Sequence, residues 1–342
     1  MKKSYYIGID ISKKTLDASI FVENMNEKRY PHVKEDNDKA GFKRILKWAS
    51  SEKVDLKDCL FCMEHTGDYG LELCLFLEQK HIEYCAVSPL VMKRAMGISR
   101  DKNDKIDSAR IATFAFEKAY KMKPSKMASE DILALKKLQA ERNLHVRERA
   151  KYKGYLSDKC TKNDGLRKRM TIMVKTLDCQ IEEVEKEMQA IIQRNHELSS
   201  NYELLLSIPG VGKVIAISTL VYTNNFKAFD NARQYACYAS VAPFVHTSGT
   251  SIHGAPTVSK MGNSQIKSEL SMGALNAMSN DPQMSEYASR KRKEGKHNGV
   301  ILNAIKFKLI ERMFAVVHRG TPYVATHEYK TLRLPNRVSE AS

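Results

Sequence analysis

The 342-residue sequence predicts an α/β domain at the N-terminus, a long helical segment in the middle and a mainly α-helical C-terminal domain. In the first third, apolar runs with the two-residue period of strands alternate with helical patterns. Residues 129–200 are rich in charged residues and contain no proline, as is typical of long helices. Beyond them, short helical patterns are separated by turns with glycine and proline. We therefore predict domains at residues 1–125, 126–200 and 201–342.

The N-terminal domain is predicted from the order of its elements. The patterns indicate strands near residues 4–11, 15–22 and 29–34, a helix near 38–50, a strand at 59–64, a helix at 69–80, a strand at 82–87 and helices from about residue 89. Consecutive strands followed by alternating strands and helices are the element order of RNase H and RuvC-like folds. We therefore predict this fold class for residues 1–125.

Four carboxylates fall at the ends of these elements. Asp10 lies in the first strand on the face that it shares with Gly8, which leaves room for a bound group. Glu64 ends the strand at 59–64, and Asp104 and Asp107 are three residues apart at the start of a helix, on one face. Like charges placed this close need a compensating cation.

A divalent metal ion is the cation that we favour for these four residues. Mg²⁺ binds through one or two carboxylates, waters and phosphate oxygens, and two such ions about 4 Å apart clamp an in-line phosphoryl transfer. We predict Mg²⁺, or alternatively Mn²⁺, at this site. In the alternative interpretation Asp10 only starts the turn at residues 12–14, while Lys102 and Lys105 compensate the two helix acids.

Composition favours a nucleic-acid-binding protein inside the cell. A net charge of +16 and a pI near 9.4 favour a polyanionic partner. No apolar run approaches the ~18 residues that span a bilayer, which predicts a soluble, cytoplasmic protein with no membrane partner. The seven cysteines are predicted to be reduced, and Cys59 and Cys62 are interpreted as core thiols. Cys59 and Cys62 should lie on opposite faces of their strand, which argues against a zinc site.

The middle segment carries a heptad stripe. Its apolar residues recur at spacings of four and three: Met170, Val174, Leu177, Ile181, Val184, Met188 and Ile191. Heptads sustained over three repeats predict a coiled-coil spacer, and hence a chain that is at least a dimer. The alternative is a long amphipathic helix packed within its own domain.

The C-terminal domain opens with a helix-hairpin-helix-like pattern at residues 204–216. Gly210 and Gly212 would present backbone N–H groups to a phosphate at a helix N-terminus, and a plain turn between core helices is the alternative. Basic runs elsewhere are either phosphate contacts or solvated faces. The nucleic-acid-binding candidates are Lys102, Lys105, Arg167, Lys168, Arg169, Gly210, Gly212, Lys213, Lys260, Arg290, Lys291, Arg292 and Lys293.

Three segments resemble the signature blocks of a known family, namely residues 8–13, 64–69 and 103–109. They look like those of the DEDD transposases of the IS110 insertion-sequence group, relatives of the Piv-type invertases. The resemblance implies that the four acids form a RuvC-like metal site. It also implies a structured guide RNA, called a bridge RNA, which pairs donor and target DNA, and a tetramer assembled from dimers.

A second block near the C-terminus resembles the same family. It runs from Tyr238 to Asn263, and the family's catalytic serine would correspond to Ser248. Ser240 and Ala242 depart from the family's usual glycine and aliphatic residue. Thr247 and Ser251 are the neighbouring hydroxyls that could take the same role. Nothing nearby in sequence resembles a Ser-His-Asp arrangement, so activation of the serine is expected to come from the acidic metal site.

We therefore interpret the sequence as a DNA recombinase that mobilises an insertion sequence in a prokaryotic cell and associates with the nucleoid when active. One alternative is a RuvC-like, structure-specific endonuclease that hydrolyses DNA with metal-bound water and never uses Ser248. A second alternative is a non-enzymatic RNA-binding scaffold whose acids are remnants.

Overall fold

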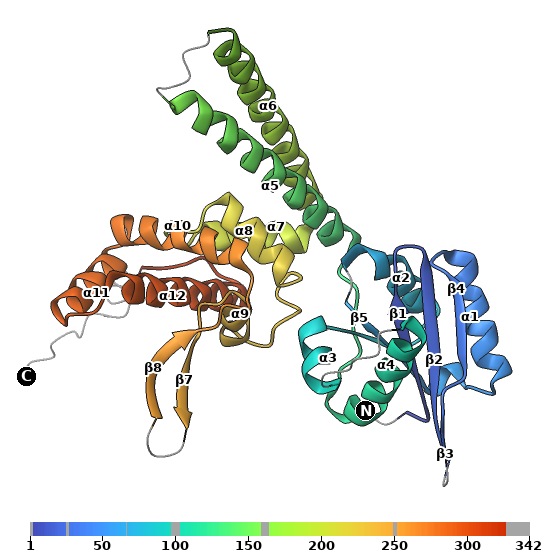
Figure 1. Cartoon of the computed structure of the whole chain (residues 1–342). Coiled ribbons are helices and arrows are strands. Elements are labelled where there is room, and N and C mark those ends of the chain that lie inside the picture. Colours follow the sequence, from blue (N-terminus) through green and yellow to red (C-terminus); the bar gives the residue numbers. More distant parts are fainter. Residues whose placement is uncertain are drawn as a thin grey trace, which may run out of the picture. The chain divides into compact units, whose positions relative to one another are not determined.

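The computed structural model describes residues 3–24, 27–65, 67–96, 103–158, 164–248 and 252–325. The chain forms two compact units, Met1–Met127 and Ala128–Ser342 (Figure 1). The first is a mixed α/β unit and the second is mostly helical. The mixed α/β domain with a mainly helical remainder is thus confirmed.

A six-stranded sheet forms the centre of the first unit. Its strands are β1 (Tyr5–Ile11), β2 (Thr15–Asn24), β3 (Glu27–Arg29), β4 (His32–Asp36), β5 (Cys59–Glu64) and β6 (Tyr84–Val87). The order is β3-β2-β1-β5-β6, and β4 also pairs with β2. The pairs of β1, β2 and β4 are antiparallel, whereas β1, β5 and β6 are parallel. This topology is compatible with the predicted RNase H-like fold.

The strand predicted at residues 29–34 is wrong, because two strands occupy this region. β3 ends at Arg29 and β4 begins at His32. Pro31 lies between them and has no N–H to donate to a ladder, so it interrupts a continuous strand. Its carbonyl oxygen instead accepts a hydrogen bond from the N–H of Ile20, at 3.0 Å.

Helices cover both faces of this sheet. Ile7 and Ile9 of β1 pack with α1 (Lys39–Ser51) and α2 (Leu71–Gln79). The opposite face packs against α3 (Pro89–Met96) and α4 (Asp104–Lys118), where Ile111 and Phe114 are buried. Strand alternation explains why β1 contributes to both cores. It also separates Cys59 from Cys62, which lie in different cores, as predicted.

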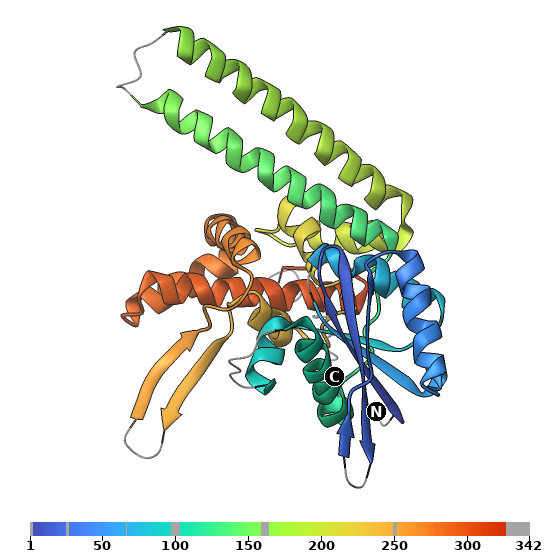
Figure 2. The same cartoon turned by 45° about the vertical axis from the view of Figure 1, so that its right-hand side comes forward.

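The second unit begins with a long antiparallel helix pair, α5 (Glu130–Ser157) and α6 (Asp164–Arg194) (Figure 2). Ion pairs join the two helices, with Arg142 Nε 2.6 Å from Glu185 Oε1 and Arg149 Nη1 2.7 Å from Asp178 Oδ1. Val184 belongs to the buried core of the same unit. Around Val184, the heptad stripe is therefore buried within one chain, as in the alternative interpretation. This burial gives no support for a dimer.

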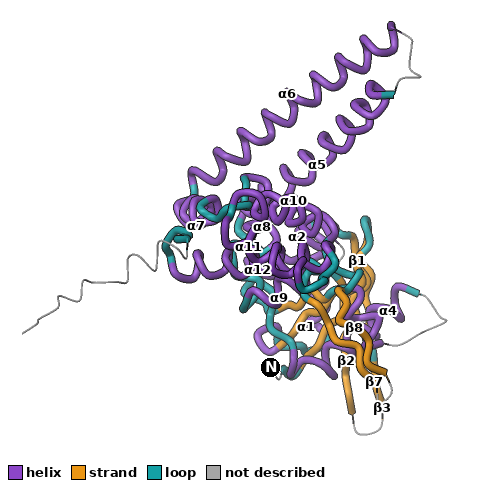
Figure 3. Tube along the Cα trace, turned by 90° about the vertical axis from the view of Figure 1, so that its left-hand side faces the viewer, coloured by secondary structure: helices purple, strands orange, loops and turns teal. Residues whose placement is uncertain are grey.

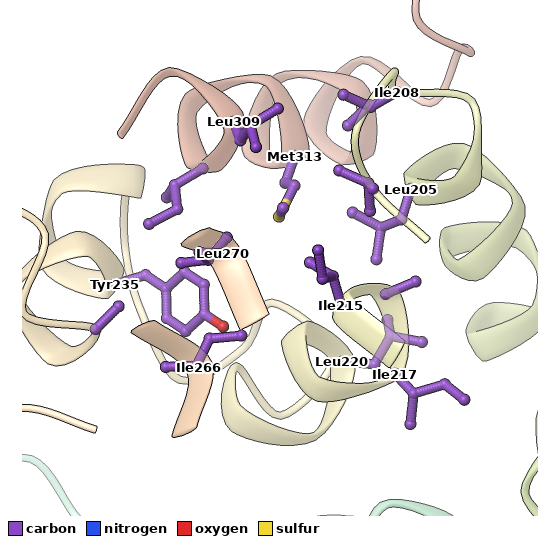
Figure 4. Packing of buried hydrophobic residues seen from close by; sticks show 14 of the residues in the cluster. Leu205, Ile208, Ile215, Ile217, Leu220, Tyr235, Ile266, Leu270, Leu309 and Met313 are labelled. Carbon is purple, nitrogen blue, oxygen red and sulfur yellow. The ribbon is translucent and has the colours of Figure 1, made fainter. Parts of the chain in front are cut away.

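Further helices and a hairpin make up the rest of the described part of the second unit (Figure 3). The helices are α7 (His196–Leu206), α8 (Lys213–Tyr222), α9 (Ala232–Tyr238), α10 (Ser264–Asn280), α11 (Pro282–Lys293) and α12 (Asn298–Arg319). Leu205, Ile215, Tyr235, Leu270 and Met313 meet in their shared core (Figure 4). Among the helices described, none combines the length and the apolar character that crossing a membrane requires.

Candidate functional site

The predicted acids of the first unit lie on neighbouring elements. Ile9 of β1 pairs with Met63 of β5. Asp10 and Glu64 are the next residues along these two strands. The carboxyl ends of these two parallel strands thus bring Asp10 and Glu64 to one edge of the sheet. Both belong to the face that packs against α4, because the alternate residues of β1 and β5 pack on the other face.

Helix α4 supplies the other two acids from its first turn. Asn103 caps this helix, since its Oδ1 accepts a hydrogen bond from the N–H of Lys105 at 3.0 Å. Asp104 and Asp107 follow the cap, where carboxylates are favoured by the helix dipole. The buried hydroxyls of Ser19 in β2 and Ser108 in α4 lie 2.7 Å apart and tie this turn to the sheet.

The space that we predicted beside Gly8 is not free. A Cβ at Gly8 would overlap the backbone of Ser108 and Ala112, because α4 packs directly on β1 at this point. Our expectation that a bound group fills the space above Gly8 is therefore wrong. The missing side chain instead lets the helix approach the strand closely, and this approach brings the first turn of α4 towards Asp10.

The electrostatics of Asp10 reflect this arrangement. Its pKa is raised from 3.8 to about 6, first by burial and then by the charges of Asp104, Asp107, Asp17 and Glu64. A carboxyl group with this many acidic neighbours resists ionisation, because each like charge disfavours the anion. The four predicted acids therefore interact electrostatically at one end of the sheet.

The sequence interpretation missed Asp17, a fifth carboxylate of this region. Asp17 pairs with Asp10 across β1 and β2, and it is almost fully buried. His32 Nε2 lies 2.9 Å from its Oδ1 and Lys34 Nζ lies 3.2 Å from its Oδ2. The hydrogen bond to Asp17 is the main cause that raises the pKa of Lys34. Counting the hairpin register across the turn at Ser12 could have revealed the pair, since the two strands are consecutive.

These acids do not form a closed ligand cluster. Among the residues that the structure describes, no three His, Cys, Asp or Glu side chains gather closely enough to hold a metal ion. The acidic region is nevertheless rich in carboxylate oxygens, the ligand type that Mg²⁺ and Mn²⁺ prefer.

Ser248 lies in the second unit, on a two-stranded hairpin formed by β7 (Pro243–Ser248) and β8 (Ile252–Val258) (Figure 1). It is the last residue of β7 and pairs with Ile252. Thr247 pairs with His253. The neighbouring candidate Ser251 lies outside the described residues, and the hydroxyl of Ser248 is likewise not described. The backbone alone therefore assigns Ser248 to the end of the hairpin nearest its turn.

Close packing fixes the base of this hairpin. Ser240 has a left-handed backbone with φ of 53°, and its Oγ accepts a hydrogen bond from the N–H of Gly262 at 2.8 Å. A Cβ at Gly262 would overlap Ser240 and approach the carbonyl oxygen of Tyr238. A left-handed backbone favours glycine, which is the residue that the family resemblance implies at the position of Ser240. The two chain segments that enter and leave the hairpin are therefore held together.

Comparison with known proteins identifies the family. Residues 7–159 match the DEDD transposases of the IS110 group, and residues 202–289 match the transposase family of IS116, IS110 and IS902. The chain belongs to the IS110 family of transposases. It is 27% identical over 330 residues to the pilin gene-inverting protein of Moraxella bovis, covering 93% of this chain and 97% of that protein.

Two further relatives agree. The pilin gene-inverting protein of Moraxella lacunata is also 27% identical over 93% of this chain and 97% of its own length. An uncharacterised protein of insertion element IS110 from Streptomyces coelicolor is 35% identical over 41% of this chain and 33% of that protein. The first match spans all four acids, and the second spans Ser248. The chain is therefore a transposase, an enzyme of DNA recombination.

The basic candidates of this IS110-family transposase are dispersed over several elements. Lys105 lies in the first turn of α4, next to the acids, and is exposed. Lys168 and Arg169 are exposed near the start of α6, whereas Lys102 lies outside the described residues. Arg167 is half-buried in the same turn of α6. The described residues alone do not single out one nucleic-acid surface.

The end of α11 carries four basic candidates in succession, Arg290, Lys291, Arg292 and Lys293. Lys291 Nζ lies 2.6 Å from Glu294 Oε2 and Arg290 Nε lies 3.9 Å from Glu294 Oε1, so two of these charges are partly compensated by the residue that follows the helix. Arg292 and Lys293 are exposed. Lys260 is exposed in the segment after β8. Cations at a helix C-terminus are also favoured by the helix dipole alone, which is the structural alternative.

The glycine turn between α7 and α8 has a packing role. Gly210 has φ of 93°, and a Cβ there would lie 2.5 Å from the carbonyl oxygen of Gly273 and 2.8 Å from Cβ of Ala277. The turn therefore packs against α10. Gly212 and Lys213 are exposed at the N-terminus of α8. Gly210 itself is half-buried, so the exposed part of the turn lies mainly at Gly212 and Lys213.

Proposed function

We propose that this transposase cuts and exchanges DNA strands with a serine nucleophile, Ser248, and a divalent metal site formed by Asp10, Glu64, Asp104 and Asp107. The observation that carries the metal site is that burial, and then the charges of the surrounding carboxylates, raise the pKa of Asp10 to about 6. Such a concentration of negative charge is offset by a bound cation.

The residues present fit a hard divalent ion. All four are carboxylates, and the thiol of Cys62 on β5 is buried in the adjacent core. Mg²⁺ suits oxygen ligands of this kind, and Mn²⁺ is the alternative. When bound, the ion would neutralise charge on the phosphate that reacts. Asp10 and Glu64 would hold it from the sheet, while Asp104 and Asp107 would hold it from α4.

Ser248 would act on the phosphodiester itself. Its Oγ would form a bond to phosphorus while the bond from phosphorus to a sugar oxygen breaks, and the serine proton is lost as that sugar oxygen gains one. The phosphoserine conserves the bond energy, so a second sugar hydroxyl can later displace the serine and rejoin a strand. The acids belong to the first unit and Ser248 to the second, so the reaction would need both.

We further propose that the partners are donor and target DNA, a structured bridge RNA, and other copies of the chain as dimers that assemble to a tetramer. The net charge of +16 supports a polyanionic partner. Family resemblance supports the RNA and the tetramer. DNA as substrate supports a cytoplasmic location.

The second candidate function is hydrolytic cleavage of DNA without Ser248. It is favoured by one observation, namely that the four acids all belong to the first unit. A RuvC-like endonuclease would need only this unit for the chemical step. Its products would carry free ends and could not be rejoined without another energy source.

A covalent trap distinguishes the two functions. The wild type, given a DNA substrate nicked so that the cleaved strand diffuses away, should accumulate a protein–DNA adduct that peptide mapping assigns to Ser248. Ser248→Ala should lose both the adduct and strand exchange, whereas Thr247→Ala and Ser251→Ala should keep both. If Ser248→Ala cleaves DNA at the rate of the wild type, cleavage is hydrolytic instead.

A further inference from the structure

Three charged residues form a row across the sheet beside the proposed metal site. Asp10 pairs with Asp17 across β1 and β2, and Asp17 pairs with Lys34 across β2 and β4. Two carboxylates directly opposite each other destabilise a strand pair, so the third member of the row has an electrostatic role. Lys34 supplies the positive charge.

Asp17 anchors the ammonium group of Lys34. The carboxylate is almost fully buried, and its two oxygens face different partners, His32 Nε2 at 2.9 Å and Lys34 Nζ at 3.2 Å. The side chain of Lys34 is 52% exposed, so its tip lies at the border between the buried pair and solvent. An exposed lysine without such an anchor would sample many rotamers.

The same ammonium group reaches the proposed ligand set. Lys34 Nζ lies 3.5 Å from Oδ2 of Asp104, on α4. Lys34 thus bridges the buried Asp17 and the exposed Asp104, of which only Asp104 is proposed as a metal ligand. A positive charge at this distance attracts the carboxylate and repels any cation that approaches it.

We propose that Lys34, held by Asp17, is a positioning residue that compensates Asp104 in the metal-free protein and lowers the affinity of the acidic site for a divalent ion. This inference rests on the proposed metal site. Lys34 is not a ligand; with an ion bound, its ammonium group would leave Asp104 and stay with Asp17. The pair would keep the acids in place between turnovers and limit how tightly the ion is held.

Calorimetric titration of the full-length protein with MnCl₂ at low ionic strength tests this role. Lys34→Gln should bind Mn²⁺ about three- to tenfold more tightly than the wild type, because a repelling charge is removed. Lys34→Arg keeps the charge and should bind as the wild type does. The matched control is Lys47→Gln, which removes the same charge from an exposed position on α1, across the sheet.

Anchoring by Asp17 is tested by a double-mutant cycle. In an Asp17→Asn background, Lys34→Gln should change Mn²⁺ affinity less than it does in the wild type, because the lysine is no longer held beside Asp104. Equal Mn²⁺ affinity of Lys34→Gln and Lys47→Gln, or weaker binding by Lys34→Gln, would overturn the inference and leave the metal site intact. If Asp104→Asn binds Mn²⁺ as the wild type does, the metal site fails and the inference fails with it.

Discussion

In the first unit, the candidate residues lie between a sheet and a helix that both pack on apolar cores, whereas in the second unit Ser248 lies at the end of a two-stranded hairpin. Phe244 and Val245 of that hairpin are exposed, while Ile9 beside Asp10 is fully buried. The strands and the helix that carry the acids are therefore held by dense packing, and the hairpin that carries Ser248 is held at its base. If the proposed roles hold, the metal ligands lie on packed elements and the nucleophile lies on a hairpin, where binding and catalytic residues are often found.

The largest effect should come from the acids. Asp104→Asn should reduce strand cleavage at least about 1000-fold, because it removes a proposed ligand, and excess EDTA should have the same effect on the wild type. Asp104 is exposed, so folding and DNA binding should be retained. Gel-based cleavage and DNA-binding assays measure both effects. The control is Glu52→Gln, an exposed acid at the C-terminal end of α1. Full activity in EDTA would contradict the proposed metal site, and the acids of the first unit would then need another role.

The helix pair of the second unit is the next test. Val184 is buried in the core of its own chain, so Val184→Lys should lower the free energy of unfolding by at least about 3 kcal/mol, independently of protein concentration. Urea denaturation at two protein concentrations measures this loss, and Glu183→Lys at the exposed neighbouring position should change little. A stable variant whose mass is halved in light scattering would show instead that the stripe joins two chains.

A smaller effect is expected where α4 meets β1. Gly8→Ala would place a methyl group against the backbone of Ser108 and Ala112, so it should destabilise the first unit by about 1–3 kcal/mol. Cleavage should fall with it, because Asp104 and Asp107 move with α4. Thermal unfolding and cleavage rates measure the two effects. Gly154→Ala in α5 meets no neighbour, and it should be neutral or stabilise its helix by about 0.5–1 kcal/mol. Unchanged cleavage by Gly8→Ala would separate the acids from this packing.

The smallest effect concerns pH. The pKa of Asp10 is about 6 in the folded protein and 3.8 as its ordinary value, so its protonated form stabilises the fold at low pH, and this contribution is lost as the pH rises through about 6. In chelator at pH 7.5, Asp10→Asn should therefore be more stable than the wild type, by about 1 kcal/mol after allowance for solvent screening. The difference should vanish near pH 3.5. Urea denaturation at both pH values checks this, and a difference that persists at low pH would exclude charge repulsion as its source.

Much of the first unit could be predicted because strand periodicity is local. Alternation along residues 59–64 predicts that Cys59 and Cys62 face different cores, and the structure confirms it. The acids could be noticed because charges stand out at the ends of apolar runs. Asp17, by contrast, does not stand out in the sequence, because it lies inside an alternating strand at what looks like an ordinary solvent-facing position. Its burial arises only when His32 and Lys34 arrive from β4.

The sequence by itself determined the family, the mixed α/β character of the first unit and the helical character of the second, because motifs and apolar periods are written along the chain. Only the tertiary structure decided which surface covers each apolar face. It pairs the stripe of α6 with α5 of the same chain, fills the space above Gly8 with α4 and sets Lys34 between Asp17 and Asp104. These outcomes depend on contacts between residues far apart in sequence, and a local period shows that a face will be buried without showing by what.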